Sequence, residues 1–323
     1  MKKSLVALAV LAASGASFAQ SSVTLYGIAD IWFGTTSGTG VESQTVLNSG
    51  GVSGSRWGLK GSEDLGGGLK ANFLLEQGFG LDNGAAAGVQ FNRQAYVGFS
   101  GGFGEVKLGN VYTAYDDISG AANSAFDSAL AAQNGVWVST NYTSNPNNNI
   151  YYATPSFGGF SGAVSYALGE NKTAALEASS VTSLNIQYAA GALYAGLGYQ
   201  TEKPQGGGAS TEFTRLNATY DFGVAKLLVG YGKLAAPVGV ETTEWELGAD
   251  FPVSAALTLS GGIAGSNDNV AAGDATRKGY GFAAAYSLSK RTTLYTGFNS
   301  HTTTAAGVDT DARTFAAGVK HTF

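Results

Sequence analysis

Residues 23–33, VTLYGIADIWF, contain the pattern that decides the fold. One side of an extended chain carries Val23, Leu25, Gly27, Ala29, Ile31 and Phe33. The other side is mostly polar, and successive side chains of a β-strand point to opposite faces of the sheet, so this alternation predicts a strand with one apolar face. The same alternation recurs in Phe213–Asp221, Glu244–Phe251 and Tyr280–Tyr286. A soluble β-sandwich would show it too, so alternation alone does not fix the architecture.

The spacing of turn segments is more informative. Short turn segments begin at Glu63, Gly101, Ser156, Ala189, Asp221, Pro252 and Ser287, and most are rich in Gly, Pro or Ser. Two strands of about ten residues and a short turn need about 25 residues, so the spacing leaves a loop of about ten residues at the opposite end of each pair. Seven short turns separate eight pairs, which predicts sixteen antiparallel strands. Short turns at one end and long loops at the other are typical of outer-membrane β-barrels, which must close on themselves because lipid cannot satisfy a free sheet edge.

The composition excludes several other classes of protein. The 323 residues include 48 Gly but only 5 Pro and no Cys, which excludes a collagen and a disulfide scaffold. The chain is 44% hydrophobic, which argues against disorder. After Gln20 no stretch of about 18 apolar residues could span a bilayer as a helix. The net charge of −5, without a basic cluster, provides no surface for nucleic acid.

The first residues have the three-part pattern of a secretory signal peptide. MKKSLVALAVLAASGASFAQ combines a basic start, a short apolar stretch and small residues before a cleavage point. We expect residues 1–19 to be removed, leaving residues 20–323 as a single barrel domain outside the cytoplasm. Loss of Lys2 and Lys3 changes the formal charge from −5 to −7.

One interval between turns is about twenty residues longer than the others. The excess falls at residues 113–148, a segment that contains Asp116, Asp117 and Asp127 and no Lys or Arg. Long irregular segments in compact folds are usually functional or disordered. We expect this segment to fold into the barrel and narrow it; the alternative is an ordinary surface loop.

The sequence offers no catalytic constellation. It has only two histidines, His301 and His321, and neither is placed for a metal site or a catalytic triad. No phosphate-binding or dinucleotide-binding glycine motif is present. We therefore expect no enzyme activity, no metal and no cofactor. The last strand ends in Phe323, an aromatic terminus that suits a barrel whose last strand must close against the first.

Several segments together resemble the general porins of β-proteobacteria along the whole mature chain. They are VTLYGIAD (23–30), SRWGLKGSEDLGGGLKANFLLE (55–76), FNRQAYVGFSGGFGEVKLG (91–109), YYATPSFGGF (151–160), YDFGVAKL (220–227), LSKRTTLY (288–295) and the terminal GVKHTF. The resemblance implies a homotrimer of sixteen-stranded barrels in the outer membrane of a Gram-negative bacterium. It implies passive diffusion of ions and small hydrophilic solutes, an inward-folded third loop, and subunit contacts by the first strands and residues 80–89.

The resemblance also implies a pore constriction with opposed charges. Its basic wall would contain Arg56, Lys60 and Arg93, with Glu76 as an inward carboxylate. The third loop would oppose them with its three aspartates. Asn110 and Asn145 stand where arginines are usual, so we expect a pore that is neutral or mildly cation-preferring.

Whether Arg215, Lys226 and Lys278 also reach the lumen is open at this stage. Three alternatives to a general porin remain: a substrate-specific outer-membrane channel, a barrel enzyme, and a secreted soluble β protein such as an adhesin. The last would expose large apolar side chains to water on every strand.

Overall fold

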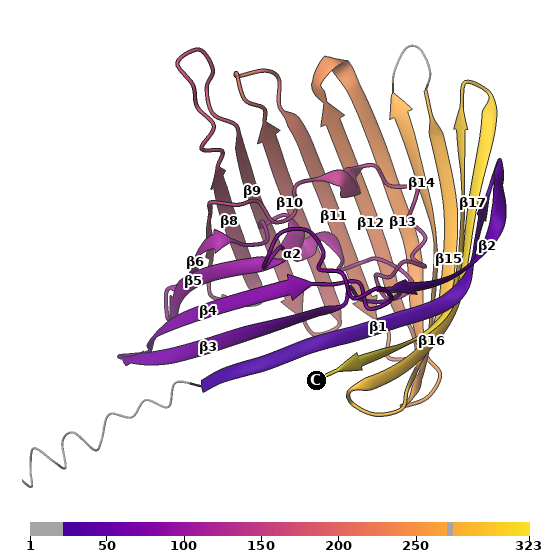
Figure 1. The fold of residues 1–323 in the computed structure, drawn as a ribbon, viewed down its shortest axis with the longest axis horizontal. Coiled ribbons are helices and arrows are strands. Elements are labelled where there is room, and N and C mark those ends of the chain that lie inside the picture. The colour runs from indigo at the N-terminus through magenta and orange to yellow at the C-terminus, as the bar shows by residue number, and fades with distance from the viewer. Residues whose placement is uncertain (1–21, 270–273) are drawn as a thin grey trace, which may run out of the picture.

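The computed structural model describes residues 22–269 and 274–323, so the expected signal peptide lies outside the described residues. Within these ranges the chain forms β-strands and short helical turns. No helix there is long and apolar enough to cross a membrane. Figure 1 shows the strands side by side as a barrel wall, with the segment that contains α2 on its inner side.

The strands of the described residues follow one another in hairpins. They are β1 (Ser22–Gly38), β2 (Val41–Ser49), β3 (Arg56–Gly66), β4 (Leu69–Gly78), β5 (Gln94–Gly101), β6 (Gly104–Asn110), β7 (Asn149–Ala153), β8 (Phe160–Leu168), β9 (Ser180–Ala190), β10 (Leu193–Lys203), β11 (Thr211–Asp221), β12 (Lys226–Ala236), β13 (Val240–Pro252), β14 (Leu257–Asn269), β15 (Thr276–Ser287), β16 (Thr292–Ala305) and β17 (Val308–Thr322). The helical turns are α2 (Asp116–Ser119) and the 3-10 turns η1 (Ser139–Asn141) and η2 (Pro237–Gly239).

Seventeen strands in the described residues occupy sixteen positions around the barrel, because β2 and β3 lie end to end beside β1. β1 pairs with β3 up to Ile28 and with β2 from Ile31 onward. Its other edge pairs with β17, Ile31 opposite Val319, and this pairing closes the sheet. All neighbouring strands are antiparallel, which confirms the sixteen-stranded barrel predicted from the turn spacing.

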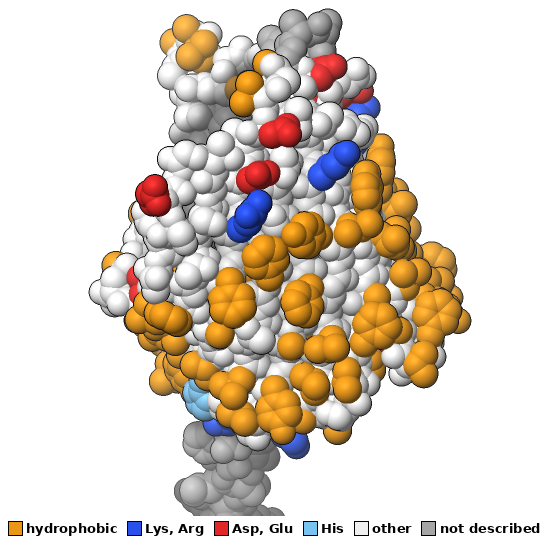
Figure 2. All heavy atoms as spheres, turned by 90° about the vertical axis from the view of Figure 1, so that its right-hand side faces the viewer, with side chains coloured by type: hydrophobic (Ala, Val, Ile, Leu, Met, Phe, Trp, Pro, Cys, Tyr) orange, Lys and Arg blue, Asp and Glu red, His pale blue; other side chains and the backbone are white. Residues whose placement is uncertain are grey.

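Alternation places apolar side chains outside and polar side chains inside. In β11, Leu216 is 46% exposed, whereas Arg215 and Asn217 point inward and are 1% exposed. Figure 2 shows a belt of hydrophobic side chains across the outer face on the β15 to β17 side, with charged side chains gathered above it. Contiguous apolar surface of this extent is unfavourable in water but is solvated by lipid.

All seven predicted short turns coincide with connections between strands, from β3–β4 to β15–β16. The opposite end is less uniform than the spacing suggested. Two-residue turns join β1 to β2 and β16 to β17, whereas residues 79–93, 111–148 and 169–179 form long connections. The turn spacing predicted a loop of about ten residues at this end of each strand pair. Some of those residues belong to strands instead, and β16 and β17 are 14 and 15 residues long.

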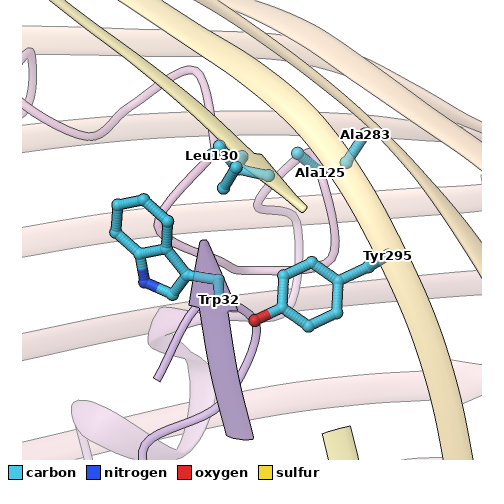
Figure 3. Close-up of a cluster of buried hydrophobic side chains, with 6 residues drawn as sticks. Trp32, Ala125, Leu130, Ala283 and Tyr295 are labelled. Atoms are coloured by element: carbon cyan, nitrogen blue, oxygen red, sulfur yellow. The ribbon is translucent and has the colours of Figure 1, made fainter. Parts of the chain in front are cut away.

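The connection between β6 and β7, residues 111–148, is called loop 3 here and is two residues longer than expected from sequence. Buried apolar side chains gather where loop 3 meets the inner wall. In one such cluster Leu130 and Ala125 of loop 3 pack with Trp32 of β1 and Tyr295 of β16 (Figure 3). The expectation that this segment folds inward is therefore met by its packing on the wall.

Candidate functional site

Loop 3 is fixed to the inner wall through its backbone. The hydroxyl of Ser183 on β9 accepts a hydrogen bond from the Tyr115 N–H at 2.6 Å. The hydroxyl of Ser260 on β14 accepts one from the Ala125 N–H at 2.7 Å. Polar residues inside the wall thus satisfy loop backbone groups that have no secondary-structure partner.

Two carboxylates on β13 hold the middle of loop 3. Glu246 Oε1 accepts a hydrogen bond from the Ser124 N–H at 2.8 Å. Glu244 accepts hydrogen bonds from the Val138 N–H and from both the N–H and the hydroxyl of Ser139. Both carboxylates are almost fully buried. The alternation of Glu244–Phe251 predicted that they face inward, but nothing in the sequence identified their loop partners.

Glycines occupy the wall where loop 3 comes closest. A Cβ at Gly281 would lie 2.0 Å from the Leu130 carbonyl oxygen, and one at Gly279 would lie 2.6 Å from Val136 Cγ2. Neither distance leaves room for a side chain. The absence of side chains at these positions lets loop 3 lie close against one side of the barrel.

Three residues of the expected basic wall contact one another. Arg93 Nε donates to Glu76 Oε1 at 2.7 Å, and Arg56 Nε lies 3.8 Å from Glu76 Oε2. The Glu76 side chain is 7% exposed, whereas the side chains of Arg56 and Arg93 are 21% and 25% exposed. The negative charge of the buried carboxylate is compensated by the two guanidinium groups. Arg56, Arg93 and Glu76 together therefore carry a net positive charge at the lumen surface.

Lys60 lies beside this group without joining its ion pairs. Its Nζ is 5.0 Å from the centre of the Tyr26 ring, and the Tyr26 hydroxyl donates to Glu76 at 2.8 Å. Arg93 lies 5.7 Å from the centre of the Tyr112 ring in a similar cation–aromatic contact. The sequence reasoning missed these tyrosines, although alternation had placed Tyr26 on the inner face.

Two of the loop aspartates accept hydrogen bonds from tyrosines. The Tyr142 hydroxyl donates to Asp116 at 2.6 Å. The Tyr151 hydroxyl and the Asn185 amide donate to Asp117 at 2.8 and 3.0 Å. Asp117 thus contacts the wall at β7 and β9, whereas the partner of Asp116 belongs to loop 3 itself, and neither carboxylate forms an ion pair with Arg56 or Arg93.

The enclosing barrel affects the charge state of these loop carboxylates. Burial raises the pKa of Asp116 to about 6, and the nearby charge of Arg93 offsets part of this rise. Although the Asp117 side chain is open to the lumen, the surrounding wall also raises its pKa to about 6, against the opposing effect of Lys107. With pKa values of about 6, both groups are mostly charged at pH 7.5 and mostly neutral at pH 5.

Asp127 lies elsewhere, towards the part of the wall that includes Arg215. Asn123 donates to it at 2.6 Å, and burial raises its pKa. Arg215 points inward but is 1% exposed, because loop 3 covers it: its guanidinium donates to the Ser119 carbonyl and lies 4.6 Å from the centre of the Trp137 ring. It is therefore not part of the open lumen surface.

Two other positively charged positions were left open by the sequence. Lys226 begins β12, beside the short turn to β11, and is half-buried on the same side of the strand as Leu228, whereas Lys278 lies outside. Lys278 is exposed and shares the outward side of β15 with Tyr280 and Phe282. It cannot contribute a side chain to the lumen. Arg56, Lys60, Arg93 and Lys107 lie on or directly beside β3 to β6.

The C-terminal residue completes the sheet. Phe323 N–H donates to the Gly27 carbonyl at 3.1 Å and its carbonyl accepts from the Gly27 N–H at 3.0 Å. A Cβ on Gly27 would lie 2.3 Å from the Phe323 ring. The ring therefore fills the space beside Gly27.

The described part of the chain, residues 22–269 and 274–323, contains no group of three or more His, Cys, Asp or Glu residues able to hold a metal ion. His321 forms a contact of 2.9 Å with the Thr292 hydroxyl at the exposed end of the barrel. His301 lies beside Gly135 of loop 3. The inner wall and loop 3 carry fixed charges, and such charges can order water and ions in a pore.

Comparison with known proteins gives consistent results. A profile of the family described as Gram-negative porin matches residues 4–307. Outer membrane porin protein 32 of Delftia acidovorans is 39% identical over 312 residues, which cover 91% of this chain and 88% of that protein. An outer membrane porin of Bordetella pertussis is 29% identical over the full length of both chains. The solved structure of the anion-selective porin from Comamonas acidovorans superposes with a TM-score of 0.80 at 30% identity, covering 94% of this chain and all of that one.

Proposed function

Since this chain belongs to the Gram-negative porin family and is a channel of the outer membrane, we propose that loop 3 forms the narrowest section of its pore. The observation that carries the proposal is the attachment of loop 3 inside the barrel. Wall groups such as Ser183, Glu246 and Ser260 bind its backbone, so it occupies the lumen on the side of β9 to β16. The space left for solutes then lies between loop 3 and the wall of β3 to β6.

In this proposal ions and small hydrophilic solutes pass by diffusion and no bond is made or broken. Polar side chains keep the lumen hydrated. Arg56, Arg93 and Lys60 on the wall and the aspartates of loop 3 create an electric field across the passage. Fixed charges in a narrow pore change the local concentrations of cations and anions, so they tune selectivity without a binding step.

We expect the pore to be neutral or mildly cation-preferring. The wall group contains three cations and one carboxylate, against three carboxylates on loop 3. Asn145, at a position where the family resemblance implies an arginine, donates its amide to the Asn92 and Arg93 carbonyls at 2.7 and 2.9 Å and adds no charge. The related Comamonas porin is described as anion-selective.

Reversal potentials in planar bilayers under a salt gradient test this proposal. We expect a value near zero or of the sign that marks cation preference. A clear anion preference would contradict the charge assignment. The variant carrying both Arg56→Ala and Arg93→Ala is expected to move the reversal potential further toward cations while the barrel remains folded.

A substrate-specific channel is the second candidate, because aromatic rings accompany the inner cations. Lys107 Nζ lies 4.9 Å from the Tyr151 ring and 5.5 Å from the Tyr96 ring, in addition to the Lys60–Tyr26 contact. Liposome swelling with sugars of graded size separates the two functions. Permeation rates that fall smoothly with size favour a general porin, and one sugar that permeates much faster than its size predicts favours a specific channel.

We further propose that the protein is a homotrimer, as the family resemblance implies. Contacts would involve the first strands and residues 80–89, which lie in the long connection between β4 and β5. A band at trimer mass on a gel that disappears on boiling is the expected result, whereas a monomer before heating would contradict it.

A further inference from the structure

Asp30 on β1 is fully buried, and its carboxylate accepts four hydrogen bonds. Oδ1 accepts from the Gly51 N–H at 2.9 Å and from the Tyr295 hydroxyl at 2.5 Å. Oδ2 accepts from the Val52 N–H at 3.1 Å and from the Ser53 N–H at 2.9 Å. A carboxylate can occupy all its acceptor positions in this way, and such charge-assisted bonds are stronger than neutral ones.

Asp30 lies beside the interruption between β2 and β3. Asp30 pairs with Lys320 of β17 on one edge of β1. On the other edge, residues 50–55, called the inward turn here, leave the sheet, so Asp30 has no paired strand residue there. The Ser55 hydroxyl replaces that partner: it accepts from the Asp30 N–H and donates to the Asp30 carbonyl, both at 3.0 Å. Side chain and backbone of Asp30 together therefore hold the inward turn.

The inward turn contacts both sides of the proposed constriction. On the wall side, Arg56 Nη2 donates to the Ser53 hydroxyl at 3.2 Å. On the loop side, the Gly51 carbonyl accepts from the Ala129 N–H of loop 3 at 2.8 Å. Because the inward turn lies between Arg56 and the adjoining part of loop 3, a shift of this turn would change how the two are placed relative to each other.

The fourth donor to Asp30, the Tyr295 hydroxyl, lies near the strands where the barrel closes. Tyr295 belongs to β16, which pairs with β17, the strand that closes on β1. Its ring packs with Trp32 and with Leu130 of loop 3, as Figure 3 shows. Gly51 accommodates the hydroxyl, because a Cβ at that position would lie 2.1 Å from it.

We propose that Asp30 is a positioning residue of the pore: it sets the distance between the Arg56 side of the wall and loop 3 by holding the inward turn. This inference rests on the proposed function of loop 3 as the constriction. A neutral amide would keep the size of the side chain but would direct an NH2 group at backbone N–H donors. At least one of those donors would then be left without an acceptor, which loosens the turn.

The test compares Asp30→Asn with Tyr295→Phe in planar bilayers, using KCl gradients and full-length mature protein. The heat-modifiable gel band confirms that each variant is folded. We expect Asp30→Asn to increase single-channel conductance, because the constriction widens, and to bring any non-zero reversal potential of the unmodified protein closer to zero. Tyr295→Phe removes one donor of four, so we expect a smaller shift in the same direction.

Asp64→Asn is the matched control, since Asp64 accepts a backbone hydrogen bond from Gly66 in an exposed turn far from the lumen constriction. It should behave as the unmodified protein. If Asp30→Asn does not fold, Tyr295→Phe decides: a folded protein with unchanged conductance and reversal potential would overturn the positioning role. The variant carrying both Arg56→Ala and Arg93→Ala separates the two ideas. No effect there would remove both arginines from the proposed constriction, whereas an effect there without one in Asp30→Asn or Tyr295→Phe would reject only the role of Asp30.

Discussion

Replacing Gly281 by alanine would place a methyl group between the inner wall and loop 3. The added Cβ would lie 2.0 Å from the Leu130 carbonyl oxygen, and an ordinary contact begins at 3.4 Å, so these atoms must separate by about 1.4 Å. The strand cannot supply this movement, because Gly281 is paired with Gly262 on one side and Asn299 on the other. Loop 3 must therefore move toward the lumen. Overpacking of a tight contact typically costs about 1–3 kcal/mol, which a barrel paired along all its strands should tolerate.

Single-channel conductance measures the consequence. We expect Gly281→Ala to form a folded, heat-modifiable barrel with lower conductance than the unmodified protein. Gly261→Ala on the adjacent strand is the matched control, because its Cβ would meet its nearest atom, the Gly281 carbonyl oxygen, at an ordinary 3.4 Å. Unchanged conductance in folded Gly281→Ala would refute the reasoning that close packing of loop 3 on the wall determines the width of the pore.

Three other predictions concern charge and assembly. Because the pKa values of Asp116 and Asp117 are raised to about 6, lowering the pH from 7.5 to 5 should neutralise both carboxylates and move the reversal potential toward anion preference. Asp116→Asn combined with Asp117→Asn should show that shift already at pH 7.5 and lose most of the pH response; a response as large as before would exclude these groups. Arg56→Ala combined with Arg93→Ala should shift selectivity toward cations, and an unchanged reversal potential would remove both arginines from the constriction. Phe323→Ala removes the ring that covers Gly27 and should reduce the yield of folded barrel from refolding, whereas a normal yield on heat-modifiability gels would show that the terminal ring is dispensable.

The number and direction of the strands followed from local features. Alternation assigns each side chain to a face, and the turn segments from Glu63 to Ser287 mark where the chain reverses. Both signals arise within about ten residues, so they are readable without knowing the fold. They also placed Glu244 and Glu246 on the polar face of their strand, although not their partners, and they left open whether Arg215 reaches the lumen.

The family resemblance added Arg56, Arg93 and Glu76, and the structure shows that these three contact one another. It did not indicate that Lys60 rests on Tyr26 rather than on Glu76. It also gave no reason to treat Asp116 and Asp117 differently from Asp127. Such distinctions depend on which strands loop 3 crosses.

The sequence by itself determined a closed sixteen-stranded barrel with an apolar exterior, because strand period and turn chemistry are short-range properties of the chain. Tertiary structure alone decided where loop 3 lies and which charges face the passage. The contacts responsible join residues far apart in sequence, such as Asp30 with Tyr295, 265 residues apart, and Glu244 with Ser139, 105 residues apart. These pairings depend on the registers of all the strands taken together around the closed barrel, so no single short segment of the sequence reveals them.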